Sequence, residues 1–266
     1  MFGLFKNRRR KKLLQQPLPD PWRRFIERNV AVFSLVTSAE RERLVAALKI
    51  IVAERSFVGS GGLAITDEVK VTIAAQAALL LLGEEGYYFD RVPTIFVYPH
   101  YQTTKTHRDL TTAHLVEEDV AIEGQVLEQG EIRLSWDEVL AGGCDPADGE
   151  NVVLHEFAHH LDRLDGEIGG TPPLASEEQR QAWICIFDRE LARLRDDLAT
   201  GRDTFLHEDA AQNRAELFAY STECFLEQPH ELDEFHPDLF DCLLSFYKTD
   251  PRSWFTEEWE RGPEKE

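Results

Sequence analysis

The sequence predicts an α+β domain that is mostly helical and carries a small sheet beside one central helix. Apolar residues recur at helical spacing through much of the chain, which is the pattern of amphipathic helices. The short run Thr94–Tyr98 is β-branched and aromatic and lies between two prolines, as is typical of a strand. A length of 266 residues, of which 42% are hydrophobic, is enough for a substantial core.

We divide the chain into a basic tail, residues 1–20, and a single domain, residues 21–266. The tail holds six basic side chains against the one acid Asp20, and its end is rich in proline. This composition favours a disordered, solvated arm; the sharper alternative is a weak contact with an acidic partner or a membrane surface. Within the domain we expect a helical part, residues 21–90, and then a core that carries the chemistry, residues 91–250.

The helical part is expected to contain three helices. Two lie within residues 22–53, where apolar side chains follow a helical period, and the second of them starts at Thr37 or Ser38. The third is long and buried, with Thr66 or Asp67 as its cap. None of the three carries residues that suggest chemistry.

Strand signals lie just ahead of the central helix. Residues 121–127 and 131–136 are separated by a turn at Gln129-Gly130, which suggests a hairpin. A strand in this place could pair with an extended peptide through its free edge. It is equally compatible with an ordinary strand inside the sheet, and the sequence leaves both interpretations open.

The central helix, residues 151–162, places two histidines and a glutamate at the spacing of a metal site. Four residues advance about 400° at about 3.6 residues per turn, so His155 and His159 project from one face and can bind the same ion. Glu156 lies beside that face, where it can act as a general base on water without being a ligand. We expect one zinc ion per chain, because zinc binds imidazole and carboxylate and leaves its fourth position to water.

Two other polar residues of this helix have less certain roles. Asp162 shares the face of the histidines and could orient a ligand imidazole, or it could be an ordinary polar residue near the helix end. His160 points about 100° away from its neighbour His159 and is interpreted as a bystander. The competing interpretation of the whole segment is a solvated amphipathic helix with incidental histidines.

A second helix with chemistry is predicted over residues 209–227, with Asp209 as the N-cap of a capping box. Glu216, Tyr220 and Glu223 follow one another at helical spacing, so they share a face. Glu216 is interpreted as the third ligand, supplied by a segment distant from the histidines. Glu223 lies about 10 Å further along the helix axis, too far to bind the same ion, and is predicted to be dispensable for the metal.

The composition excludes several classes of protein. Lys and Arg number 29 against 49 for Asp and Glu, and the net charge of −20 argues against general affinity for nucleic acid or anionic lipid, although a local basic patch stays possible. The four cysteines are scattered without a close pair, which suggests a reducing compartment. No transmembrane segment is expected, and the basic N-terminus lacks the apolar core of a secretion signal. We expect a cytoplasmic protein.

Several short segments, spread over most of the chain, match the motifs of one known family. They are Trp22 after the basic start, Ile73–Leu82, Val97–Pro99, Leu134–Trp136, Asp145–Gly149, Asn151–Asp162, Gly170–Leu174 and Asn213–Ala219. In these segments, loops included, the chain resembles the Mlc titration factor A family of bacterial zinc peptidases, which are similar to the catalytic domain of anthrax lethal factor. The resemblance implies a zincin-like metallopeptidase fold.

The resemblance also implies roles for single residues. By position in the motifs, His155 and His159 bind zinc, Glu156 is the general base, and Glu216 is the third ligand. The family further implies aminopeptidase-like activity on a peptide or protein substrate, and binding to a glucose-repressor-type transcription factor, that is, an Mlc-like repressor.

One departure from the family pattern concerns the oxyanion. Related sites usually carry a tyrosine about seven residues before the third ligand, whereas this chain has Asp209 there. Either Tyr220 takes that role or the site works without it.

Two rival functions belong to other classes. One is a regulatory binding protein that sequesters a transcription factor, with residual or partner-controlled peptidase activity. The other is a metal-stabilised structural domain, against which Glu156 speaks, because a structural zinc needs no general base and commonly has four protein ligands.

Overall fold

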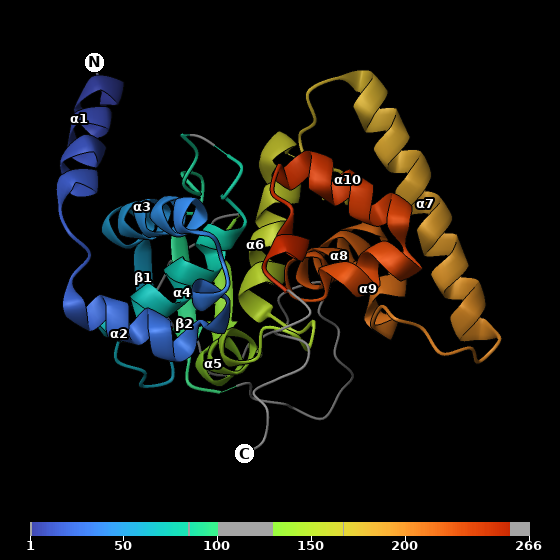
Figure 1. Cartoon of the computed structure of the whole chain (residues 1–266), viewed down its shortest axis with the longest axis horizontal. Helices are drawn as coiled ribbons and strands as arrows, with labels where there is room; N and C mark the ends of the chain where they lie inside the picture. Colours follow the sequence, from blue (N-terminus) through green and yellow to red (C-terminus); the bar gives the residue numbers. More distant parts are fainter. Residues whose placement is uncertain (1, 85, 101–129, 167, 256–266) are drawn as a thin grey trace, which may run out of the picture.

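The structure, a computed structural model, describes residues 2–84, 86–100, 130–166 and 168–255. Figure 1 shows α6 (Val152–Asp162) between two groups of elements, with the N-terminal helices and the sheet on one side and the C-terminal helices on the other. The other helices and the strands are α1 Phe2–Gln15, α2 Asp20–Asn29, α3 Ser38–Glu54, β1 Ser56–Gly59, α4 Asp67–Leu79, β2 Thr94–Tyr98, β3 Ile132–Ser135, α5 Trp136–Cys144, α7 Glu177–Ala199, α8 Arg214–Glu227, α9 Pro229–Phe235 and α10 Pro237–Tyr247. The α+β fold, mostly helical with a small sheet, is therefore as the sequence predicts.

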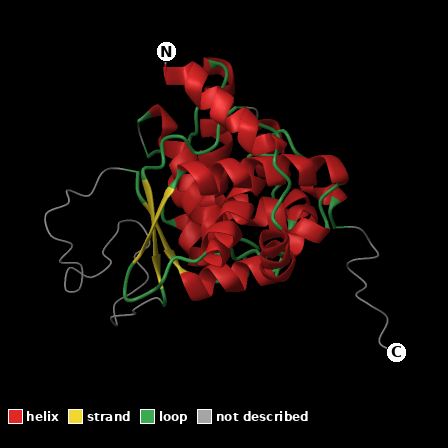
Figure 2. Ribbon diagram, turned by 90° about the vertical axis from the view of Figure 1, so that its left-hand side faces the viewer, coloured by secondary structure: helices red, strands yellow, loops and turns green. Residues whose placement is uncertain are grey.

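The sheet is parallel, in the order β1-β2-β3, and lies at the edge of the helical body (Figure 2). Ile95 of β2 pairs with Phe57 on one side and with Ile132 on the other. Parallel neighbours need a crossover connection, and α4 lies in the one between β1 and β2. β3 in turn contacts α6, so the sheet supports the central helix.

The predicted hairpin is only partly tested. Its second strand exists as β3, but it ends at Ser135, and Trp136 begins α5. β3 pairs with β2 in parallel, a pairing that a two-residue hairpin turn cannot produce. The proposed first strand, residues 121–127, lies outside the described residues.

Two helix starts follow from capping side chains, as predicted. Thr37 and Glu40 form a reciprocal capping box at the start of α3: the Thr37 hydroxyl accepts from the Glu40 backbone N–H, and the Glu40 carboxylate accepts from the Thr37 N–H. At the start of α4, the Thr66 hydroxyl accepts from the Val69 N–H at 3.3 Å. Each bond satisfies an amide that the first helical turn would otherwise leave without a partner.

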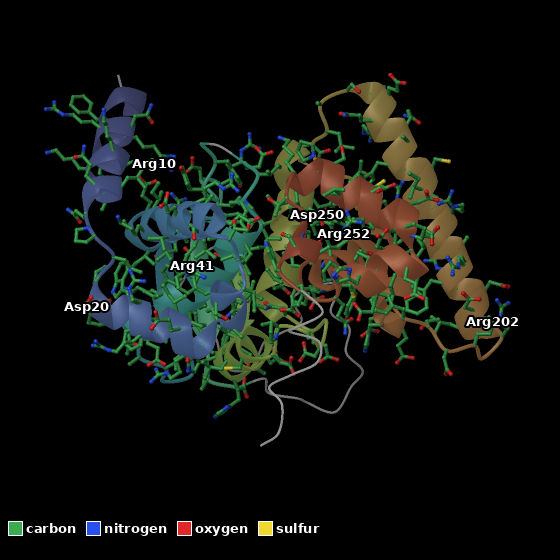
Figure 3. All side chains as sticks on the ribbon, in the orientation of Figure 1. Arg10, Asp20, Arg41, Arg202, Asp250 and Arg252 are labelled. Atoms are coloured by element: carbon green, nitrogen blue, oxygen red, sulfur yellow. The ribbon has the colours of Figure 1, made fainter. Side chains whose placement is uncertain are left out.

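Residues 2–15 of the tail, for which a disordered arm is expected, form α1 in the structure, and this helix lies against α3. Arg10 lies on the side of α1 that faces the body (Figure 3), and it is only 8% exposed. Its guanidinium donates to Glu54 at 2.7 Å and also to Asp90. A buried guanidinium with two carboxylates fixes the helix in place, which the count of charges in the sequence could not reveal.

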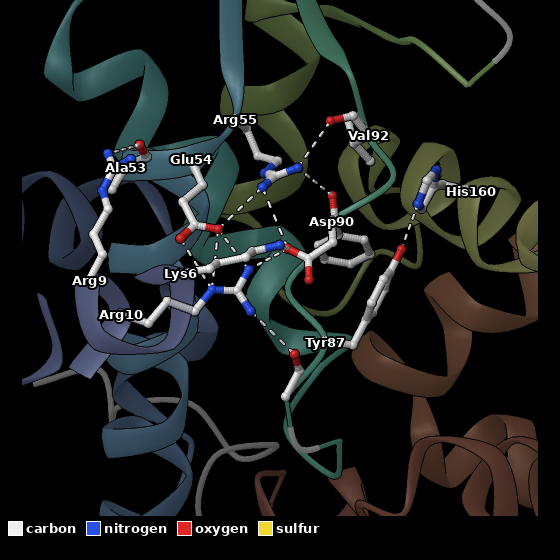
Figure 4. Close-up of polar contacts among 12 residues, drawn as sticks. Lys6, Arg9, Arg10, Ala53, Glu54, Arg55, Tyr87, Asp90, Val92 and His160 are labelled. Atoms are coloured by element: carbon white, nitrogen blue, oxygen red, sulfur yellow. Dashed lines mark hydrogen bonds and ion pairs between the residues drawn. The ribbon is translucent and has the colours of Figure 1, made fainter. Parts of the chain in front are cut away.

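A series of polar contacts leads from α1 to His160 on the central helix α6 (Figure 4). Asp90, the partner of Arg10, belongs to the loop between α4 and β2, and Arg91 from the same loop donates to the carbonyl of Leu164, just beyond α6. The hydroxyl oxygen of Tyr87, also in this loop, lies 2.7 Å from Nε2 of His160. The loop therefore connects α1 to α6 on the side of α6 that carries His160.

A helix that crosses a bilayer must be both long and apolar. None of the helices in the described ranges meets both conditions.

We expect Arg10→Ala to lower the free energy of unfolding by about 1–3 kcal/mol, because it removes the donor that bridges Glu54 and Asp90 and leaves these carboxylates only their longer contacts with Arg55 and Lys6. Urea unfolding followed by circular dichroism measures this change. Arg8→Ala, an exposed position on the same helix, is the matched control and should change stability little. Equal effects of the two substitutions would show that α1 does not dock through Arg10.

The effect of Arg10→Ala should also depend on pH. Burial raises the pKa of Asp90, but hydrogen bonds from Arg10 and Lys6 outweigh it and hold that pKa below its usual value. A carboxyl with a depressed folded-state pKa contributes stability above its unfolded pKa and loses it as pH falls. The stability difference between wild type and variant should thus be full near neutral pH and shrink below about pH 4. A difference that stays constant into strong acid would contradict this account.

Candidate metal centre

The central helix α6 begins at a capping asparagine. Oδ1 of Asn151 accepts hydrogen bonds from the backbone N–H groups of Val153 and Leu154, each at 3.1 Å. Phe157 and other apolar residues of the helix are buried against α4, α5, α8 and β3. The cap and this packing fix the helix, so that the side chains on its polar face have defined positions.

The predicted ligands His155, His159 and Glu216 lie together. Nε2 of His155 is 3.1 Å from Nε2 of His159. Oε2 and Oε1 of Glu216 lie 3.3 and 3.4 Å from the Nε2 atoms of His155 and His159 respectively. The structure therefore brings α6 and α8 together at three atoms that could share one metal ion.

These separations fit a tetrahedral zinc site. Bonds of about 2.0–2.1 Å to nitrogen and carboxylate oxygen in tetrahedral geometry place neighbouring ligand atoms about 3.3 Å apart. The two Nε2 atoms lie 3.1 Å apart, and the distance from each of them to the nearer oxygen of Glu216 is 3.3 or 3.4 Å. In addition, Oε2 of Glu216 is buried, and apart from its ion pair with His155 it has no hydrogen-bond partner among the described residues; a buried carboxylate oxygen of this kind calls for a cation.

The electrostatics of the cluster favour positive charge. Burial lowers the pKa of His155, but Glu223 and Glu216 outweigh it and raise the value to about 10. Burial raises the pKa of Glu216, yet hydrogen bonds from the two imidazoles bring it down to about 2. Carboxylates that stabilise the protonated ring of His155 also favour a divalent cation, which would replace the proton.

Glu223 has a role that its spacing did not predict. Its Oε1 accepts from Nδ1 of His155 at 2.8 Å, and its Oε2 accepts from the backbone N–H of Asn151 at 2.6 Å. It is not part of the group of three ligand residues, but it fixes the ring of His155 with Nε2 toward the cluster. The expectation that Glu223 is dispensable for the metal is therefore revised.

Asn151 connects a second buried acid to the same network. Its Nδ2 donates to Oε1 of Glu227 at 2.9 Å and to the carbonyl of Gly142 at 3.2 Å. Burial raises the pKa of Glu227 well above its usual range, and the hydrogen bond from Asn151 offsets this only in part. One side chain thus ties the start of α6 to both α8 and α5.

Glu156 lies next to the cluster and is half-buried. Its charge is among those that raise the pKa of His155, so the carboxylate is close enough to act on the site electrostatically. This position is compatible with the predicted general base, and that role remains a prediction.

Neither Asp162 nor His160 belongs to the cluster. Asp162 is fully buried, and its two oxygens accept from the backbone N–H groups of Gly170 and Thr171 at 2.8 and 2.7 Å. It therefore anchors the loop after α6, while the carboxylate that orients an imidazole is Glu223. His160 bonds to Tyr87 instead, in agreement with its interpretation as a bystander of the metal.

The predicted helix start at Asp209 is wrong. Residues 208–211 form a short 3-10 turn, and α8 begins at Arg214 because Asn213 caps it by accepting from the N–H groups of Ala215 and Glu216. Asp209 instead lies beside Tyr220, whose hydroxyl is 3.5 Å from its Oδ2. Position 209 thus lies next to Tyr220 and supplies a carboxylate where the related sites have a phenol.

Sequence reasoning missed Asn151 and His207 as residues around the site. Asn151 immediately precedes the metal helix, and an asparagine there is a recognisable cap signal. His207 stacks on the ring of Tyr220, which contacts the cluster, and no spacing rule could place it there because it comes from the turn before α8.

Comparisons with known proteins show the family to which the chain is related. The family model described as glucose-regulated metallo-peptidase M90 matches residues 4–248. An uncharacterized protein of Synechocystis sp. is 32% identical over 244 residues, which are 91% of this chain and 89% of the relative. Proteins named Mlc titration factor A from Yersinia pestis and Yersinia pseudotuberculosis are each 27% identical over 234 residues, 84% of this chain and 83% of theirs. The resemblance drawn from the motifs is confirmed.

We expect Glu223→Gln to weaken zinc binding by about 10- to 100-fold, because it removes the charge that holds His155 while leaving the ligands in place. Competition with a chromophoric chelator measures the affinity. Glu231→Gln, an exposed position on α9, is the control and should bind zinc as the wild type does. If the two variants bound zinc equally well, Glu223 would be dispensable after all.

Proposed function

Because the chain belongs to the family of glucose-regulated metallo-peptidases, M90, we propose that it is a zinc-dependent peptidase whose single ion is bound by His155, His159 and Glu216. The observation that carries the proposal is the cluster of ligand atoms: the Nε2 atoms of His155 and His159 lie 3.1 Å apart, and each lies 3.3 to 3.4 Å from a carboxylate oxygen of Glu216. Three protein ligands of this kind leave the fourth position that a catalytic zinc keeps for water. Glu156 beside them supplies the base that a purely structural site does not need.

The proposed mechanism assigns proton transfer to Glu156. When bound, zinc lowers the pKa of water towards about 7 and polarises the scissile carbonyl. Glu156 accepts a proton from the water that attacks the carbonyl carbon. It holds this proton on a carboxylate oxygen and passes it to the leaving nitrogen as the C–N bond breaks. Glu223, through His155, keeps the ligand set in one geometry during these steps.

We propose peptide or protein substrates, cleaved in an aminopeptidase-like manner as the family resemblance implies. β3 supports a mode of binding: it is the last strand on its side of the described sheet and contacts α6. An extended peptide added to such an edge forms main-chain hydrogen bonds along the strand. The peptide would then run beside the metal helix.

We also propose that this chain binds a transcriptional repressor of the Mlc type, in the cytoplasm. The name of the Yersinia relatives, Mlc titration factor A, supports this proposal. The net charge of −20 favours contact with the repressor protein and disfavours contact with its DNA. The alternative function, a regulatory binding protein with residual or partner-controlled peptidase activity, rests on the same name.

Replacing Glu156 with Gln should retain zinc, because Glu156 is not a ligand, while turnover falls by about 10²- to 10⁴-fold through loss of the base. Peptide cleavage profiling together with metal analysis measures both quantities. Glu177→Gln, an exposed site at the start of α7, should behave as wild type. Full activity of the Glu156 variant would rule out the mechanism, and repressor binding that survives in it would separate the regulatory function from the peptidase.

Removing the metal should abolish peptide hydrolysis and lower the melting temperature, since an ion that binds only the folded protein stabilises it by mass action. Dialysis against a chelator, followed by calorimetry and by readdition of zinc, tests this expectation. We expect about one zinc per chain in the untreated protein. Metal analysis that finds no transition ion in protein purified without chelators would refute the zinc assignment.

A further inference from the structure

The helix α1 differs in charge from the rest of the chain. It holds six basic residues and no acidic one, whereas the whole chain has a net charge of −20. Each of the other α-helices that the structure describes contains at least one aspartate or glutamate. One helix therefore carries a charge opposite to that of the body on which it lies.

Two buried basic side chains hold α1 against the body. Arg10, near the middle of the helix, bonds to two carboxylates of the body. Lys49 on α3 is only 7% exposed, and its Nζ donates to the carbonyl of Leu14 at 3.3 Å, near the end of α1. A cation at the C-terminal end of a helix also interacts favourably with the helix dipole. These contacts fix the rotation of α1 about its axis and so decide which of its side chains face solvent.

The outward side of α1 carries basic side chains with one phenylalanine among them. At about 100° per residue, five exposed residues lie at least about 100° around the axis from the buried Arg10. They are Phe5, Arg8, Arg9, Lys11 and Lys12, which form the basic stripe. The side chain of Phe5 is 69% exposed, an unusual position for an aromatic residue that has no partner.

The charge of the basic stripe is not neutralised by neighbouring acids. Arg8, Lys11 and Lys12 form no ion pair with any residue in the described part of the chain. By contrast, the exposed Arg193 and Arg202 each pair with an aspartate. The stripe is therefore free to meet an anionic surface outside the protein.

We propose that the basic stripe binds the surface of an anionic lipid bilayer, with Phe5 inserted among the headgroups. Clusters of Lys and Arg on a helix bind such surfaces, and each basic side chain raises the affinity about fivefold. The bilayer also buries an exposed apolar side chain, a contact that the phosphates of a nucleic acid do not offer. The inference goes beyond the proposed peptidase function and does not depend on it.

The acidic body does not prevent this contact, because α1 lies at one end of the molecule. Figure 1 shows α1 at one end of the longest dimension and α7 at the other. Exposed charges are largely screened from one another beyond about 8 Å at physiological ionic strength. A surface that meets α1 is therefore attracted by the stripe and hardly repelled by the distant acids.

The central experiment measures binding of the full-length protein to lipid vesicles by flotation. Vesicles of phosphatidylglycerol and phosphatidylcholine should bind half of the protein at about 0.1–1 mM lipid, and vesicles of phosphatidylcholine alone should bind none. Binding should weaken as salt is added, because salt screens the charges. Wild type that fails to bind the anionic vesicles would refute the inference.

A pair of double variants tests whether the stripe itself makes the contact. Arg8→Gln with Lys12→Gln should weaken vesicle binding about 25-fold, since two basic side chains are lost. The matched control, Arg193→Gln with Arg202→Gln, changes the net charge by the same amount away from α1 and should bind as wild type does. If both double variants lost affinity equally, net charge would govern binding and the stripe would not.

Phe5→Ala distinguishes a bilayer from other anionic partners. It removes an apolar contact and no charge, so binding to the anionic vesicles should weaken about 10-fold while the salt dependence stays the same. Vesicle binding that is unchanged in Phe5→Ala would overturn the inference. So would tighter binding of wild type to duplex DNA than to the anionic vesicles at equal salt, because the stripe would then recognise nucleic acid. No outcome depends on peptide cleavage, so a failure here would leave the peptidase assignment intact.

Discussion

The hydrogen bonds of Asn151 are the interaction on which the site depends. Its side chain caps α6, and it also ties the start of that helix to Glu227 on α8 and to Gly142 on α5. Its backbone N–H holds Glu223, which in turn holds His155. A helix cap alone is worth about 1 kcal/mol, but here the same residue also sets how α6 and α8 lie relative to each other. The geometry of the ligands follows from that placement.

This arrangement concentrates carboxylates in the interior. Glu216, Glu223 and Glu227 on one helix are all buried, and buried charge is costly unless it is paired or neutralised. The three carboxylates have different surroundings. Glu216 faces the two imidazoles, and Glu223 bonds to His155 and Asn151. Burial raises the pKa of Glu227, which favours its neutral form. A divalent cation at the imidazoles would supply the remaining positive charge, which is why the metal and the fold are expected to stabilise one another.

The sequence predicted what depends on local spacing and missed what depends on packing. The single turn between His155 and His159 placed both on one face, and Glu216 was found from its helix. The role of Glu223 was missed because its bond to His155 depends on how two distant helices pack. Nothing in the sequence indicated that α1 docks through Arg10. A run of basic residues is usually solvated, and the acidic partners Glu54 and Asp90 lie far away in the sequence. Asp209 fits a capping-box pattern in the sequence, but Asn213 lies directly before the helix and caps α8 instead.

The central claim is that one zinc ion is bound jointly by α6 and α8. Anomalous diffraction at the zinc absorption edge, from crystals of the zinc-loaded protein, tests it most directly. The account predicts a single strong peak at about 2.0–2.1 Å from Nε2 of His155, Nε2 of His159 and a carboxylate oxygen of Glu216. A peak bound by other residues, or an ion that the histidines bind without Glu216, would contradict it.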